Sequence, residues 1–430
     1  MPSSKKMGLN KKAFAAICAL AIAGSVIYEL PYIKYVYYDS LNVAFGMTEE
    51  QSGFLLSMYA IGCIIFYIPG GIIADRYSTK KLMIISLLST GVLGMILAFT
   101  MSYTAALIIF FLFAISTSFV FWTALMKALR IIGGKEDSGS AYGWYYALGS
   151  VVALVASFVF LYFYNLGLPD HKAAIFGVIM SMSIAAIISA VLVLFLYKDN
   201  DDPAAQTAEE DRFHFKDLPL ALKNKYVWLA SILMFLMYAT YSCASYFTPY
   251  LTARIGMEVQ DSALLAVIRT YVLFFLSPLG GYIADKLLKS TLKFYAIGFV
   301  FLGALYIGVI FVPGDPSSMG LAVALSFLAS AFGIMMYGIM WSILNEINIP
   351  LAFAGTAVGI ASIITYTPDL FMHTIFGGWL DKFGAESGYF RIFMTLGIMA
   401  FLAVILSLYL AKEAKKTIVS APEKDAAVKV

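Results

Sequence analysis

Arg269 is the side chain of this sequence best suited to bind an anion. It lies about eight residues, or roughly 12 Å, inside an apolar run over residues 262–284. A charge at the centre of a bilayer costs roughly 2.5 kcal/mol or more, so a guanidinium there is expected to have a function. Its planar fork of donors fits a carboxylate, sulfonate or phosphate. Arg269 either binds such a group from outside the protein or forms a permanent ion pair within its own half of the chain.

A carboxyl group and an imidazole follow in a later apolar run. Asp369 and His373 are one helical turn apart, directly after Pro368, which should loosen the local hydrogen-bond ladder. A buried carboxyl group holds its proton more tightly, and histidine titrates near neutral pH. We therefore expect the two side chains to take up and release a proton together. Asp369 alternatively neutralises Arg269, and both interpretations hold if a ligand or a proton breaks that pair.

Glu29 and Lys34 flank Pro31 in the first apolar run. Their spacing of five residues suits a helical pair poorly unless the proline bends the chain. Glu29 is expected to be a second proton site or a ligand contact, or else simply the partner of Lys34. Lys34 either joins Arg269 in binding an anion or extends its amine to the outer membrane interface.

Aromatic side chains could complete a binding cavity around these charges. Tyrosines of this kind lie on the apolar runs over 13–37 and 226–251. Two tryptophans lie near the ends of the runs over 104–130 and 319–345, at corresponding places in the two halves. They could stack on an organic ligand, or they could pack against neighbouring helices or form an interfacial belt. The candidate ligand contacts are Tyr28, Tyr32, Trp122, Tyr241, Tyr246 and Trp341.

The elements that carry these residues are predicted to be membrane-spanning helices. Hydrophobic residues make up 61% of the chain and charged residues 13%, whereas roughly a quarter of a soluble domain is charged. Apolar runs long enough to cross a hydrocarbon core of about 30 Å recur along the sequence. We predict an all-α membrane protein with twelve transmembrane helices, over residues 13–37, 52–74, 82–101, 104–130, 140–164, 173–197, 226–251, 262–284, 293–312, 319–345, 354–379 and 390–411.

These helices fall into two sets of six, one on each side of a long hydrophilic stretch. We expect a six-helix bundle over 1–197, a cytoplasmic linker over 198–225, a second six-helix bundle over 226–411 and a cytoplasmic tail over 412–430. Lys and Arg crowd the amino terminus, alternate loops and the tail. By the positive-inside rule, this distribution predicts that both termini are cytoplasmic.

A repeated motif relates the two sets. The sequence Gly-Gly-Ile-Ile-Ala-Asp-Arg over 70–76 returns as Gly-Gly-Tyr-Ile-Ala-Asp-Lys over 280–286, each time at the predicted cytoplasmic end of the second helix of its set. A repeat in corresponding places predicts two bundles related by internal pseudo-symmetry.

The repeated motif resembles the signature of the major facilitator superfamily, and the resemblance covers nearly the whole chain. The signature places a glycine, an aspartate and basic residues between the second and third helices. The matching residues are Gly71, Asp75, Arg76 and Lys80 in the first copy, and Gly281, Asp285 and Lys286 in the second. The resemblance implies that this loop latches the outward-facing state, with its aspartate at the positive end of a helix dipole.

Other segments are similar to a poorly characterised bacterial branch of the superfamily. They are Trp-Thr-Ala-Leu-Met-Lys-Ala-Leu-Arg over 122–130, Tyr-Thr-Pro-Asp-Leu-Phe over 366–371 and Gly-Gly-Trp-Leu-Asp-Lys-Phe-Gly over 377–384. The arginine-glycine and glycine-proline patterns of many proton-coupled members and drug antiporters are missing from the fourth and fifth helices, which disfavours multidrug efflux.

Together these features predict a secondary active transporter of a bacterial inner membrane. We expect it to carry a small organic solute, anionic or sugar-derived, by symport with protons and alternating access between two bundles. An uncoupled facilitator and a proton-driven efflux carrier are the alternatives. We expect no enzymatic activity, no cofactor or metal and no nucleic-acid partner, because no suitable cluster or basic face is present. A monomer in the lipid bilayer is the default assembly.

Overall fold

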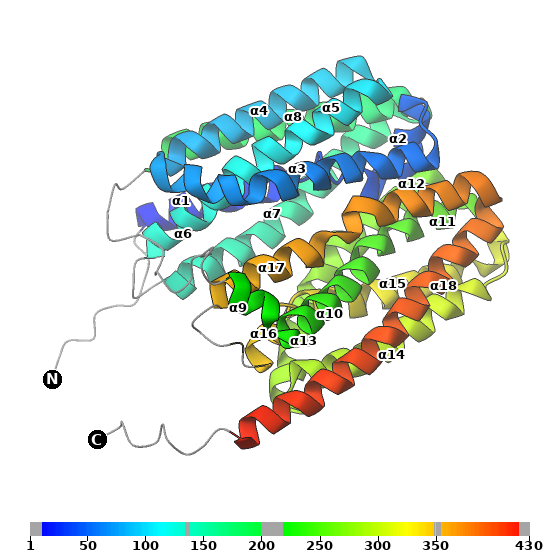
Figure 1. The fold of residues 1–430 in the computed structure, drawn as a ribbon. Coiled ribbons are helices and arrows are strands. Elements are labelled where there is room, and N and C mark those ends of the chain that lie inside the picture. Colours follow the sequence, from blue (N-terminus) through cyan, green and yellow to red (C-terminus); the bar gives the residue numbers. More distant parts are fainter. Residues whose placement is uncertain (1–10, 134–137, 199–217, 348, 350–353, 421–430) are drawn as a thin grey trace. The chain divides into compact units, whose positions relative to one another are not determined.

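The computed structural model describes residues 11–133, 138–198, 218–347, 349 and 354–420, and these residues form helices and connecting turns without any strand (Figure 1). They divide into two compact units. Unit 1 comprises residues 1–207, 257–272 and 370–382, and unit 2 comprises residues 208–256, 273–369 and 383–430. The predicted division of the chain at the linker stays a prediction, and most of the linker lies outside the described residues.

Unit 1 is built mainly from long helices. Its helices are α1 (Lys11–Val26), α2 (Lys34–Phe45), α3 (Glu49–Arg76), α4 (Thr79–Thr100), α5 (Tyr103–Ala114), the π-helix η1 (Ile115–Trp122), α6 (Thr123–Gly133), α7 (Ser138–Gly167), α8 (His171–Leu196), α12 (Val259–Val267) and the π-helix η6 (Ile268–Val272). Contacts join α4 with α8, α7 with both α1 and α8, and α3 with α5. Short segments from the second half of the sequence, α12 and η6, also belong to this unit, where they pack against α2 and α7.

Unit 2 contains more interrupted helices. Its helices are α9 (Leu218–Lys223), α10 (Lys225–Ser242), η5 (Cys243–Tyr246), α11 (Phe247–Ala253), η7 (Leu273–Leu276), α13 (Ser277–Tyr282), η8 (Ile283–Leu288), α14 (Thr291–Ile310), η9 (Pro316–Ser318), α15 (Met319–Tyr337), α16 (Ser342–Glu346) and α17 (Ala354–Tyr366). The helix α18 (Pro368–Ser420) belongs to this unit except at residues 370–382, which belong to unit 1. Contacts join α10 with α17 and α14 with α15.

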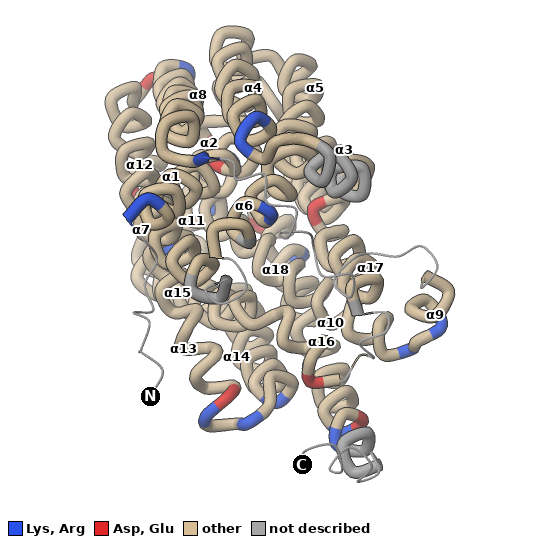
Figure 2. Tube along the Cα trace, turned by 90° about the vertical axis from the view of Figure 1, so that its left-hand side faces the viewer, with Lys and Arg blue, Asp and Glu red and all other residues tan. Residues whose placement is uncertain are grey.

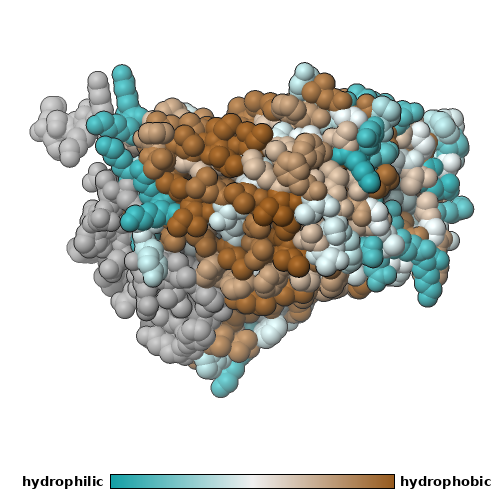
Figure 3. Space-filling model, turned by 90° about the horizontal axis from the view of Figure 1, so that it is seen from above, coloured by the Kyte–Doolittle hydropathy of each residue, from teal (hydrophilic) through white to brown (hydrophobic). Residues whose placement is uncertain are grey.

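The described helices suit a membrane. Nine helical stretches among them are long and apolar enough to cross a bilayer. Exposed large apolar side chains recur at helical spacing on α4, at Ile85, Leu88, Val92, Ile96 and Phe99, and on α8, at Ile184, Ile188, Val191 and Phe195. Figure 3 shows a broad hydrophobic band with hydrophilic residues at its two ends, and few charged residues lie along the helices in Figure 2. Such a band is the surface that lipid chains solvate.

Several predicted continuous helices are interrupted in the structure, among them the first and the eighth, which both carry candidate site residues. The first, predicted over 13–37, breaks at residues 27–33 between α1 and α2. The eighth, predicted over 262–284, changes from α12 to the π-helix η6 and then to the 3₁₀-helix η7 before α13 begins. Proline explains the first interruption, because Pro31 cannot donate a backbone hydrogen bond.

The last two predicted spans are two helices within α18, separated by a kink at Gly384, where φ is 70° and the backbone is not helical. Residues on both sides of this kink are helical, including those of the predicted loop between residues 379 and 390. Glycine adopts the left-handed conformation without steric cost, so the chain can change direction at this residue. The helix also continues to Ser420, into the predicted tail.

Candidate functional site

Glu29 lies in the interrupted segment between α1 and α2. The phenolic hydroxyl of Tyr271 donates a hydrogen bond of 2.6 Å to its Oε2 atom. Tyr271 belongs to η6, so the bond joins the interrupted parts of two predicted spans. Broken helices place polar backbone and side chains inside a membrane only where a cavity or the protein interior solvates them.

A cavity lies beside this hydrogen bond. It has room for about one water molecule, and its polar lining comes from Glu29, Tyr32, Tyr37, Ser157 and Tyr271. Apolar side chains from α2, α7, α8 and α12 complete the wall, at Val36, Phe160, Met182 and Val267, together with Ile33 from the interrupted segment. An apolar wall with a few convergent polar groups is typical of a small-molecule site.

Arg269 shares η6 with Tyr271, two residues away. Its side chain is buried, with 3% of its surface exposed. The π-helix η6 packs against α7, and π-helical turns recur at functional sites because the widened turn redirects its side chains. A buried guanidinium therefore lies on the same short element as the tyrosine that binds Glu29. Sequence reasoning selected Arg269 and Glu29 but missed Tyr271, although its position two residues after Arg269 was a usable indication.

Lys34 begins α2 and is also buried, with 1% of its surface exposed. Its amine lies 5.1 Å from the centre of the Tyr38 ring, within unit 1. Lys34 also acts on Glu49 at the start of α3. Burial raises the pKa of Glu49, and a hydrogen bond from Tyr38 and the positive charge of Lys34 lower it. Lys34 therefore contributes to the electrostatics of the Glu49 end of α3.

Asp369 lies in unit 2 and accepts two hydrogen bonds from α10. Tyr238 donates to Oδ2 at 2.6 Å, and Ser242 donates to Oδ1 at 2.7 Å. The carboxyl group is 4% exposed. Since Tyr238 and Ser242 are one turn apart on α10, one helical face binds both carboxyl oxygens. Arg269 falls in unit 1, so the predicted ion pair of Arg269 with Asp369 stays a prediction.

Tyrosine rings surround the Asp369 contact. Tyr241 stacks on Tyr337 with ring centres 4.2 Å apart, and Tyr238 meets Tyr366 edge to face at 4.7 Å. Tyr337 and Tyr366 were not predicted, because each lies at a helix end where an aromatic residue fits an interfacial belt equally well. The cluster forms a polar aromatic environment for one carboxyl group.

The remaining aromatic candidates lie in different surroundings. Tyr28 meets Trp122 at 6.5 Å, and Tyr32 meets Tyr59 at 5.6 Å, both edge to face within unit 1. Tyr246 is buried in η5, whereas Trp341 is 37% exposed. Of the set, the structure therefore places Tyr32 on the wall of the Glu29 cavity. Ligand contact by the others stays a prediction.

His373 is fully buried in unit 1, with its ring centre 5.9 Å from that of Tyr35. Asp369 and His373 are one turn apart on α18, but Asp369 bonds to α10 and the His373 ring contacts Tyr35 on α2. His373 also contributes its carbonyl oxygen to a close helix contact, because a Cβ atom at Gly53 would lie only 2.1 Å from that oxygen.

The latch residues are described unequally. Gly71, Asp75 and Arg76 lie near the end of α3, where the structure does not describe side chains. Lys80 is half-buried in the first turn of α4. In the second copy, Asp285 and Lys286 are exposed on the π-helix η8, and Gly281 lies one residue before the end of α13, with its nearest neighbour at ordinary contact distance. The latch role stays a prediction for both copies.

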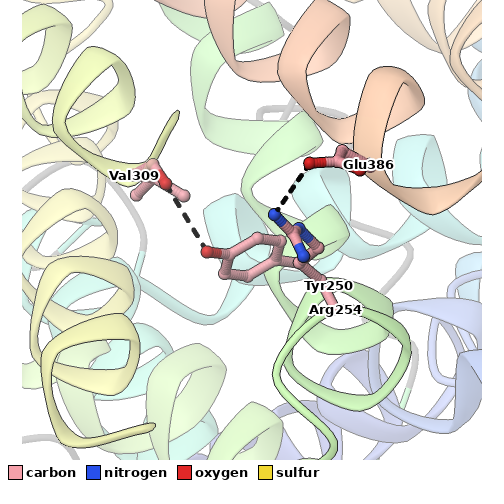
Figure 4. A network of polar contacts seen from close by, with 4 residues as sticks. All are labelled: Tyr250, Arg254, Val309 and Glu386. Atoms are coloured by element: carbon pink, nitrogen blue, oxygen red, sulfur yellow. Dashed lines mark hydrogen bonds and ion pairs between the residues drawn. The ribbon is translucent and has the colours of Figure 1, made fainter. Parts of the chain in front are cut away.

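Unit 2 contains a second pocket, whose lining residues the sequence did not indicate as a site. This pocket is lined by aromatic side chains and by Arg254 and Glu386, which form an ion pair of 3.3 Å. Figure 4 shows Arg254 beside Tyr250, whose hydroxyl approaches the carbonyl of Val309 at 3.5 Å. Because Glu386 is largely exposed, this pair contributes little to stability.

The sequence is similar to those of known membrane transporters and inner membrane proteins. Residues 13–368 match the family model of the Major Facilitator Superfamily. The chain is 28% identical over 415 residues to the inner membrane protein YqcE of Escherichia coli, which covers 96% of this chain and 97% of that protein. It is 25% identical to the cis,cis-muconate transport protein of Acinetobacter baylyi, over 80% of this chain and 81% of that one. It is 22% identical to the hexuronate transporter of Bacillus subtilis, over 87% and 91%.

A solved structure has a similar fold. The structure of a D-xylose-proton symporter superposes with a TM-score of 0.65 at 17% identity, and the match covers 94% of this chain and 97% of that one.

Proposed function

Because this chain belongs to the major facilitator superfamily and is therefore a membrane transporter rather than an enzyme, we propose that it carries a small organic anion by secondary active transport. The observation that supports this proposal best is the buried guanidinium of Arg269 on η6, two residues from the Tyr271 hydroxyl that donates to Glu29. A buried cation on an interrupted transmembrane helix is the arrangement in which broken spans bind charged solutes near the bilayer midplane.

An organic acid fits these groups. Arg269 would bind a carboxylate or sulfonate through two parallel hydrogen bonds, and the tyrosines of the Glu29 cavity would contact a hydroxylated or unsaturated carbon skeleton. Two relatives are named for organic acids, hexuronate and cis,cis-muconate. We propose a sugar acid or a small carboxylic acid as the substrate class, with Lys34, Tyr28, Trp122, Tyr241, Tyr246 and Trp341 as further candidate contacts.

Proton symport would use the carboxyl groups. Asp369 is held by Tyr238 and Ser242, and Glu29 by Tyr271, so either could exchange these donors for a proton during the cycle. His373, buried one turn from Asp369, would be the third coupling group. Uptake of a proton with an anion reduces the charge that must cross the apolar core.

The proposed architecture has twelve transmembrane helices in two pseudo-symmetric bundles, in a bacterial inner membrane. Both termini would be cytoplasmic, and a monomer would be the working unit. Transport would rock one bundle against the other, with Asp75 and Asp285 in the paired cytoplasmic latches.

The function is tested by reconstituting the purified protein in liposomes that contain a pH-sensitive dye. External hexuronate, a dicarboxylate, an organosulfonate and a neutral sugar are added one at a time. We expect internal acidification with an organic acid and none with the neutral sugar. Arg269→Ala should abolish the change, and Arg254→Ala serves as the matched control. Acidification with the neutral sugar alone would contradict the anion proposal, and solute entry without acidification would favour an uncoupled facilitator.

A further inference from the structure

The superfamily-like signature occurs a third time, on α18. Gly377, Asp381 and Lys382 have the glycine, aspartate and basic residue at the spacing that Gly71, Asp75 and Arg76 show in the first copy. This third copy follows the eleventh predicted span rather than the second or eighth. The cytoplasmic latch does not account for it, because the orientation predicted for the chain places it at the opposite membrane face.

The structure gives Asp381 a specific partner, the amino terminus of α3. Its Oδ1 atom accepts from the backbone N–H of Glu49 at 3.0 Å, and its Oδ2 atom accepts from that of Glu50 at 2.8 Å. These are the first two residues of α3, whose N–H groups have no acceptor within their own helix. A carboxylate at this end of a helix is also favoured by the helix dipole.

The capping residues next to α3 do not bind the backbone N–H groups of Glu49 and Glu50, so Asp381 can accept from both. Thr48 Oγ1 accepts from the N–H of Gln51 at 3.2 Å, and Gln51 Oε1 accepts from the N–H of Thr48 at 3.1 Å. This reciprocal capping box satisfies the third N–H of α3 and none of the first two. The carboxylate from α18 therefore completes the cap.

Below Asp381, the two helices touch backbone to backbone. A Cβ atom at Gly377 would lie 2.1 Å from the carbonyl oxygen of Glu49, and one at Gly53 would lie 2.1 Å from that of His373. One turn further along α3, Ser57 and Thr374 share a hydrogen bond of 2.8 Å between their hydroxyls. Residue numbers rise on α3 as they fall on α18, so this α3–α18 seam is antiparallel. Its two glycines exclude any larger side chain without separation of the helices.

We propose that Asp381 is the latch that closes the α3–α18 seam at the Glu49 end of α3, opposite the end that carries Asp75. The inference rests on the proposed alternating-access function, in which a segment from the second half must separate from a first-half helix during each cycle. The two hydrogen bonds from backbone N–H groups to Asp381 stabilise the closed state. The glycine contacts determine how closely α3 and α18 approach each other in that state. Transport then breaks this latch when the pathway opens at the Glu49 end.

The test measures how often the seam opens. Ser57 is buried at its inner end, so Ser57→Cys, in a chain with Cys18, Cys63 and Cys243 replaced by Ala, reports opening through its labelling rate with a charged maleimide. We expect Asp381→Ala to raise that rate roughly two- to fivefold, the range for a partly exposed charge at a helix terminus. Glu386→Ala, an exposed carboxylate on the same helix that pairs with Arg254, should leave the rate unchanged.

Gly53→Ala is the second variant, and it opens the seam by a different route. We expect it to raise the labelling rate while Asp381 is still present. Thermal melting and gel filtration verify that each variant is folded. If Asp381→Ala labels at the parental rate, whether or not Gly53→Ala labels faster, the latch is wrong. The assay needs no substrate, so this failure would leave the Arg269 proposal standing, and a failure of Arg269 to bind anions would leave the latch standing.

Discussion

Tyr271 donates a hydrogen bond of 2.6 Å to Glu29 across 242 positions of sequence, and it joins two helices that are both interrupted where they meet. Each interruption alone would expose backbone polar groups to an apolar medium, which costs several kcal/mol per unsatisfied group. The bond and the adjacent water-sized cavity give those polar groups a common interior environment. We regard this pair as the structural core of the proposed site.

The Glu29–Tyr271 pair should be energetically coupled. In a double-mutant cycle of Glu29→Gln and Tyr271→Phe, we expect a coupling free energy of about 1 kcal/mol, because the bond is partly buried and its acceptor is a carboxyl group. Unfolding in mixed micelles, followed by tyrosine fluorescence, measures it. Additive effects would show that the two side chains act independently.

Asp369 should be required for coupling rather than for binding. We expect Asp369→Asn to lose accumulation driven by a pH gradient and to retain exchange of internal for external solute, since amide nitrogen and oxygen cannot carry the transported proton. Tyr238→Phe removes one of its two donors and should reduce driven uptake roughly tenfold. Equal loss of exchange and driven uptake in Asp369→Asn would argue against a coupling role.

The second copy of the signature offers a matched pair of glycines. A Cβ atom at Gly280 would lie 2.3 Å from the carbonyl oxygen of Met335, whereas at Gly281 the nearest atom would be 3.6 Å away. We expect Gly280→Ala to lower the free energy of unfolding by about 1–3 kcal/mol through overpacking, and Gly281→Ala to change it by less than about 0.5 kcal/mol. Thermal melting distinguishes the two, and equal stability would refute the close packing of α13 on α15.

Glu49, which precedes the predicted span over 52–74, should give stability a defined pH dependence. Burial raises its pKa above the unfolded value, with Tyr38, Asp39, Lys34 and Asp381 as the neighbouring titratable groups and Asn42 as a hydrogen-bond donor at 3.1 Å. A raised carboxyl pKa stabilises the fold fully below the unfolded pKa, and that contribution is lost as the pH rises through the folded pKa.

Glu49→Gln removes this titration and keeps a similar shape. We expect the variant to melt at a higher temperature than the parent at pH 7 and at the same temperature at a pH well below the ordinary glutamate pKa of 4.5, where Glu49 is protonated in both states. A constant difference across this range would show that Glu49 does not titrate in it.

The sequence predicted the class of fold well, because a bilayer imposes long apolar helices that composition alone reveals. It also selected Arg269, Glu29 and Asp369 as candidate site residues, since charged residues are rare in such helices, and their role stays a prediction. Their partners could not be foreseen in the same way. Tyr271, Tyr337 and Tyr366 resemble interfacial or packing aromatics until the fold brings distant helices together. The contact of Asp381 with α3 could not be predicted either, because its partners are backbone N–H groups, which every residue except proline has.

The central claim, that Arg269 binds the substrate anion, is tested most directly by thermal stabilisation of the purified protein across the panel of organic acids, sulfonates and neutral sugars. A ligand at about 100 times its Kd stabilises the folded state by roughly 2.7 kcal/mol. We predict that at least one organic acid raises the melting temperature of the parent and of Arg254→Ala, and has no effect on folded Arg269→Ala at the same concentration. Equal stabilisation of all three proteins by that acid would contradict the account.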